Sequence, residues 1–88
     1  MLKISTISDS DQAIQFQLEG NLVGPWVEEL RKLSDEALSQ QETVSLDLGK
    51  LWFVDAQGVS LLRDLARRQV SQINCSQFVT EQLKEPIL

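Results

Sequence analysis

Apolar and polar side chains alternate along two stretches of the sequence, residues 13–19 and 43–48. Because successive side chains of a strand point to opposite faces of a sheet, this period of two predicts strands with one buried and one polar face. Residues 2–7 favour a further strand, and the turn-forming run at 8–11 joins it to the next strand as a hairpin. The apolar positions of the two alternating strands are Ile14, Phe16, Leu18, Val44, Leu46 and Leu48.

Apolar residues spaced three to four apart predict two longer helices. The first runs over residues 25–39, where Pro25 suits the first turn because its missing N–H costs nothing there. The second follows the turn at 55–58 and ends near Gln69. The apolar positions that predict these helices are Trp26, Val27, Leu30, Leu33, Ala37 and Leu38 in the first, and Val59, Leu61, Leu62, Leu65 and Ala66 in the second.

The C-terminal part of the pattern adds one short strand and one short helix. Residues 70–74 suit the strand, and Ser76 suits the cap of a helix over 77–85 that Pro86 ends. A strand, a helix and another strand in succession imply a right-handed crossover and parallel pairing. The sequence therefore predicts a single α/β domain over residues 1–88, whose four-stranded mixed sheet is covered mainly on one face by helices.

Composition excludes several classes of function. The net charge is −5 with only eight Lys and Arg residues, which argues against a nucleic-acid binder because phosphate contacts need clustered cations. Histidine is absent, which removes Ser-His-Asp and Cys-His arrangements and most zinc sites. We therefore expect no enzyme activity, no cofactor and no metal.

The sequence also favours one compartment. It contains no run of about 18 apolar residues and no N-terminal secretory signal. A lone Cys75 forms no internal disulfide and fits a reducing environment. We expect a cytoplasmic protein without direct insertion into a membrane.

The turn at 55–58 is the candidate site for function. Asp55 suits the N-cap of the second long helix, where a side-chain oxygen accepts a hydrogen bond from an otherwise unpaired backbone N–H. Trp52 and Phe53 precede this turn, and adjacent side chains of an extended chain point to opposite sides. We predict that Phe53 lies in the core and that Trp52 is at least partly exposed, as an anchor for a partner.

The order of elements and several local motifs resemble the STAS family, the sulphate transporter and anti-sigma-factor antagonist domains. The most specific motif combines residues 44–48, Val-Ser-Leu-Asp-Leu, with residues 53–62, Phe-Val-Asp-Ala-Gln-Gly-Val-Ser-Leu-Leu. Weaker likenesses lie at residues 16–22 and 74–79, so that the resemblance covers nearly the whole chain. It implies the STAS fold and a bacterial signalling protein that acts in transcription regulation by binding other proteins.

The sequence departs from this family at the turn. In its anti-sigma-factor antagonists, the residue before the glycine is a Ser or Thr that a partner kinase phosphorylates, and that position here is Gln57. Ala56 stands where relatives, including those of lipid-transport ABC complexes, often carry a hydroxyl. Because a neutral amide resembles the unmodified hydroxyl more than a phosphate, we hypothesise a domain held permanently in its binding state. Phosphorylation is not expected at Gln57. Ser60 is interpreted as a surface residue of the first helical turn, with phosphorylation of its hydroxyl as the open alternative.

The resemblance implies a protein partner, such as an anti-sigma kinase, another signalling protein or a transport ATPase. Two alternatives stay open: a structural subunit that self-associates as a homodimer through the open sheet face, and an accessory subunit of a lipid-transport ABC complex. The residues predicted to contact a partner comprise the turn, the exposed side of the second long helix and one aromatic residue: Trp52, Asp55, Ala56, Gln57, Gly58, Ser60, Arg63, Asp64 and Arg67.

Overall fold

The computed structural model describes residues 1–10, 12–40 and 43–84. Each element expected from the hydrophobic pattern is present. The elements in chain order are β1 (Leu2–Asp9), β2 (Ala13–Leu22), α1 (Pro25–Ser39), β3 (Thr43–Val54), α2 (Ala56–Arg67), β4 (Ser71–Ile73) and α3 (Gln77–Lys84). No helix within these described ranges is long and apolar enough to cross a membrane.

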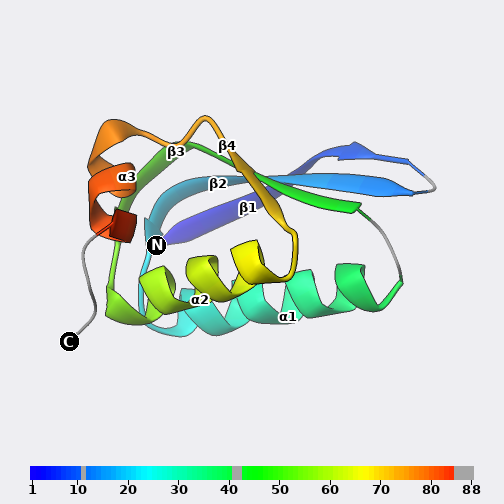
Figure 1. Ribbon diagram of the computed structural model, residues 1–88, viewed down its shortest axis with the longest axis horizontal. Helices are drawn as coiled ribbons and strands as arrows, with labels where there is room; N and C mark the ends of the chain where they lie inside the picture. Colours follow the sequence, from blue (N-terminus) through cyan, green and yellow to red (C-terminus); the bar gives the residue numbers. More distant parts are fainter. Residues whose placement is uncertain (11, 41–42, 85–88) are drawn as a thin grey trace.

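The four strands form one mixed sheet in the order β1-β2-β3-β4. Strands β1 and β2 pair antiparallel as the predicted hairpin, whereas β3 pairs parallel with β2 and β4 pairs parallel with β3. Helices α1 and α2 lie side by side beneath one face of the sheet, and α3 lies at the end of the sheet where β3 ends (Figure 1). The predicted α/β class, with a mixed sheet covered mainly on one face, is confirmed.

The predicted alternation in β2 matches its burial. Phe16 and Leu18 are buried on the face that the helices cover, and the alternating Gln15 and Gln17 are only partly buried on the other face. One hydrophobic cluster fills the space between sheet and helices. Its fully buried large side chains include Leu18, Leu22, Leu30, Leu46, Leu48, Leu61, Leu62 and Leu65.

Strand β3 extends past the predicted end at residue 48 and loses the period of two there. Between Asp47 and Lys50 it advances one residue more than β2, and it does so again where Trp52 has no partner in β2. Both irregularities are β-bulges, which insert an extra residue and re-aim the side chains that follow.

The prediction that Phe53 lies in the core is wrong. Phe53 is 43% exposed and Trp52 is 73% exposed, while Leu51 and Val54 on either side are buried. The bulge at Trp52 replaces the alternation with a spacing of three between inward positions, so that two neighbouring aromatic side chains both face solvent. The prediction that Trp52 is at least partly exposed is confirmed.

The helix boundaries agree with the pattern to within two residues. Helix α1 matches its predicted range, with Pro25 in the first turn. Helix α2 ends at Arg67 rather than near Gln69, because the backbone of Gln69 is left-handed (φ 68°) and turns the chain back toward the sheet. Ser76 caps α3 as predicted, since its Oγ accepts a hydrogen bond from the Val79 N–H at 3.2 Å. The predicted end near residue 85 and the stop at Pro86 lie outside the described residues.

Candidate functional site

Asp55 lies where β3 ends and α2 begins. Its backbone is extended, and its Oδ1 accepts a hydrogen bond from the N–H of Gly58 at 2.7 Å. The predicted N-cap is therefore confirmed. This bond gives a partner to one of the N–H groups that the first turn of a helix leaves unpaired.

The second carboxylate oxygen of Asp55 serves another helix. Its Oδ2 accepts a hydrogen bond from the N–H of Gly24 at 3.0 Å, across 31 residues of sequence. Gly24 is the N-cap residue of α1 and has no side chain to cap it. One carboxylate thus binds the N-termini of both long helices, where the helix dipoles favour negative charge. Sequence reasoning missed this role, although a helix that begins at Gly-Pro without a capping side chain was a signal for it.

Gly58 fixes how closely α2 approaches the sheet. A Cβ at this position would lie 2.6 Å from Cγ1 of Val54 and 2.8 Å from the carbonyl oxygen of Leu22. The first turn of α2 therefore packs directly on the ends of β3 and β2. In this fold Gly58 is buried and acts in packing, so it offers no side chain to a partner.

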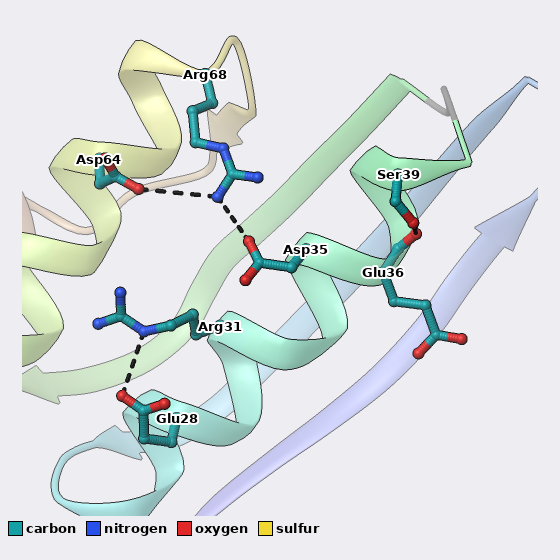
Figure 2. Close-up of polar contacts among 7 residues, drawn as sticks. All are labelled: Glu28, Arg31, Asp35, Glu36, Ser39, Asp64 and Arg68. Carbon is teal, nitrogen blue, oxygen red and sulfur yellow. Dashed lines mark hydrogen bonds and ion pairs between the residues drawn. The ribbon is translucent and has the colours of Figure 1, made fainter.

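The head of α2 is its N-terminal end, residues 56–60, and its exposed residues are Ala56, Gln57 and Ser60. Together with Glu28 and Arg31 of α1 they line an open hollow of about 400 Å³ between the first turns of the two helices. Glu28 Oε1 lies 3.2 Å from Arg31 Nε, so that the α1 side of the hollow carries a paired acid and base (Figure 2). The structure thus brings three of the predicted contact residues together.

Asp64 belongs to an ion-pair group on the flank of α2 that faces α1. Arg68 Nη1 lies 2.6 Å from Asp35 Oδ1 and 3.9 Å from Asp64 Oδ2, which links the two helices near the C-terminus of α2 (Figure 2). All three side chains are about half exposed, and such pairs contribute roughly 0–1 kcal/mol each. The contribution of these pairs to stability is therefore small.

Arg63 turns the other way, toward α3. Its Nε donates a hydrogen bond to the carbonyl oxygen of Leu83 at 3.1 Å, and its Nη2 donates to the same oxygen. Ser60 and Arg67 are exposed between these two flanks. The predicted contact residues of α2 therefore point in three directions: Asp64 toward α1, Arg63 toward α3, and Ser60 and Arg67 toward solvent. Arg63 is already hydrogen-bonded within its own chain.

Trp52 lies apart from the head of α2. It lines a separate hollow of about 510 Å³ with Glu19, Lys50 and Ser76, and this hollow shares no residue with the one between α1 and α2. Glu19 belongs to the polar face of β2, so the Trp52 hollow lies on the sheet face that α1 and α2 leave uncovered. The predicted contact residues form two surfaces rather than one.

The sequence matches a known family over most of its length. The family model described as "Mlab, STAS domain" matches residues 5–79. A search of curated proteins finds no match.

Several solved structures share the fold. The anti-sigma factor antagonist SpoIIAA, in its unphosphorylated form, aligns with a TM-score of 0.68 at 21% identity over 93% of this chain and 82% of that one. The STAS domain of an antisigma-factor antagonist from Rhodobacter sphaeroides aligns with a TM-score of 0.62 at 18% identity over 99% and 96%. A protein from Shewanella loihica with a SpoIIAA-like fold gives 0.59 at 16% identity over 92% and 72%. These likenesses confirm the predicted STAS-like fold.

Proposed function

The chain belongs to the STAS domain family, and from this premise we propose that it is a non-catalytic module that binds another protein through the head of α2. The binding surface comprises Ala56, Gln57 and Ser60 together with Glu28 and Arg31 across the hollow. Two of its structural relatives are named as antagonists of anti-sigma factors, which are themselves proteins. These names support a protein partner. We propose that the chain and its partner act in a bacterial signalling system in the cytoplasm.

One observation carries the proposal: the head of α2 is exposed, while the residues beside it are hydrogen-bonded and packed on the sheet. Ala56 and Gln57 face solvent, while the flanking Asp55 and Gly58 are joined by a hydrogen bond of 2.7 Å and packed on the sheet. A surface that is ordered before binding loses less conformational entropy when a partner docks. Side chains that face solvent on such a turn are available for contact at little cost in stability.

The chemistry of Gln57 suggests a site that is always competent to bind. An amide has no hydroxyl to accept a phosphate, so the charge of about −1.5 to −2 that phosphorylation adds cannot arise at this side chain. The surrounding side chains include one acid and one base that already pair, Glu28 and Arg31. The partner therefore meets a neutral amide in a hollow of balanced charge.

An added negative charge at the turn is expected to block binding. In a pull-down from native lysate followed by mass spectrometry, wild type should capture a partner that Gln57→Asp captures poorly. With that partner purified, calorimetry should give a Kd raised about tenfold or more, as expected for a charge placed in a desolvated contact.

A matched control adds the same charge elsewhere. Gln12 is exposed and lies between β1 and β2 in the chain. The end of the sheet where β1 passes into β2 lies opposite the head of α2 (Figure 1). Gln12→Asp should bind like wild type. Equal affinity of Gln57→Asp and wild type for every captured partner would show that the turn is not the interface.

A second candidate function is self-association through the uncovered sheet face, which Trp52 favours. Trp52 is 73% exposed and its neighbour Phe53 is 43% exposed, and Trp is enriched among the residues that dominate binding at protein interfaces. Glu19 and Lys50 line the same hollow, and no ion pair joins them within the described part of the chain. If Glu19 of one copy meets Lys50 of the other in a two-fold contact, symmetry forms the reciprocal pair as well.

Light scattering and fluorescence separate the two functions. Trp26→Phe leaves Trp52 as the only tryptophan of the chain. For a module that binds a different protein, we expect a monomer whose emission is that of a water-exposed indole at every concentration. A dimer whose emission shifts to the blue as concentration rises would instead establish self-association, and Lys50→Glu should then dissociate it.

A further inference from the structure

The C-terminal half of β3 lacks a strand on one side. Strand β4 pairs only with residues 45–47 of β3, and in the described chain no strand continues that ladder to Val54. Helix α3 lies there instead, against the end of β3 (Figure 1). The backbone groups of Val54 on this side therefore need a partner other than a strand.

Gln82 of α3 supplies that partner. Its Nε2 donates to the carbonyl oxygen of Val54 at 2.8 Å, and its Oε1 accepts from the N–H of Val54 at 3.3 Å. A side-chain amide offers the same donor and acceptor as the peptide group of a neighbouring strand. Because the Val54 residue is only 1% exposed, water is poorly placed to replace these bonds.

Three further contacts hold α3 in the position from which Gln82 reaches Val54. Val79 is fully buried in the core, and Ser76 caps the first turn of the helix. At the other end, Arg63 of α2 donates to the carbonyl oxygen of Leu83, one of the carbonyls that the last turn leaves without an intrahelical partner. Helix α3 thus joins the end of β3 to α2, the two elements between which the turn lies.

We infer that Gln82 is a positioning residue for the head of α2: by holding Val54 on the side away from β2, it fixes the carboxylate of the next residue, Asp55, against the N–H groups of Gly58 and Gly24. Strand β2 holds the same junction from the other side, where the N–H of Asp55 donates to the carbonyl oxygen of Leu22 at 3.2 Å. Hydrogen bonds from α3 and from β2 therefore hold the start of the turn on its two sides. The effect on binding rests on the proposed function, whereas the effect on the turn does not.

The test compares Gln82→Leu with Glu81→Leu, an exposed neighbour on the same helix. Amide hydrogen exchange is followed by NMR, without any partner, at Val54, Gly24, Gly58 and, as a reference for global unfolding, Leu30 in the middle of α1. In Gln82→Leu, exchange at Val54, Gly24 and Gly58 should accelerate about tenfold more than at Leu30, as expected for the loss of two hydrogen bonds. Glu81→Leu should leave these ratios unchanged.

A merely structural role for Gln82 gives a different pattern. If Gly24 and Gly58 accelerate only as much as Leu30, the inference is wrong, whatever Val54 does. Should Gln82→Leu fail to fold, Gln82→Glu keeps an acceptor for the Val54 N–H and removes the donor, and the same ratios decide the question. Partner affinity of the Gln82 variant should fall several-fold. Because the exchange ratios need no partner, their failure is distinct from a failure of the Gln57→Asp experiment.

Discussion

Gly58→Ala is expected to lower the free energy of unfolding by about 2–3 kcal/mol, a cost typical of overpacking a core. At an ordinary helical position the same change would stabilise the protein by about 1 kcal/mol through helix propensity. Here the new methyl group would meet Val54 Cγ1 at 2.6 Å and the Leu22 carbonyl oxygen at 2.8 Å, and a backbone oxygen within a sheet cannot move aside. Urea denaturation measures the change, and the midpoint of thermal unfolding should fall by roughly 10–20 °C for a domain of this size.

The matched control is Ser60→Ala, at an exposed position two residues further along α2. Propensity alone acts there, so a gain of a few tenths of a kcal/mol is expected. The opposite signs at the two positions separate packing from propensity. A Gly58→Ala variant as stable as wild type would mean that α2 does not press on the ends of β2 and β3 as described.

Asp55→Ala is expected to cost about 2–3 kcal/mol of stability, more than the loss of an ordinary N-cap, which is typically about 1 kcal/mol. The carboxylate accepts hydrogen bonds from Gly58 and Gly24, and both N–H groups lose their partner at once. Bonds to a charged acceptor contribute about 1.5–3 kcal/mol each when desolvated, and partial exposure reduces that value here. Chemical denaturation followed by circular dichroism measures the loss.

The intermediate variant is Asp55→Asn. An asparagine retains one acceptor oxygen for the cap on Gly58 but presents an NH₂ group toward the N–H of Gly24, so about half of the loss should remain. Relative to wild type, Asp55→Asn should accelerate amide hydrogen exchange more at Gly24 than at Gly58. If Asp55→Asn is as stable as wild type, the link from α2 to α1 carries no energy and Asp55 is only a local cap.

Local pattern accounts for most of the fold. Period-two alternation in β2 and the helical spacing in α1 reflect which face of each element meets the core, and both predictions agree with the burial of the residues. The predicted end of α2 was less accurate. The residue in the left-handed conformation that follows this helix is Gln69, whereas a glycine usually marks such an end.

The site was predicted in part. The N-cap role of Asp55 and the exposure of Trp52 follow from residue type and position, and the structure bears out both. The division of the predicted contact residues into two surfaces was not foreseen. It arises because the Trp52 hollow lies on the uncovered face of the sheet, while Gln57 lies on the helical side.

The sequence by itself determined the order of elements, the buried face of the regular ones and the cap at the head of α2, because each depends on residues within a few positions of one another. Only the tertiary structure decided the exposure of Phe53, which depends on how β3 bulges against β2. It alone also decided three long-range hydrogen-bond contacts, which join Asp55 to Gly24, Arg63 to Leu83 and Gln82 to Val54 across 31, 20 and 28 residues. Backbone N–H and carbonyl groups are the same in nearly every residue, so a sequence pattern does not indicate which distant side chain will bind them. That partner is defined only when the chain is folded.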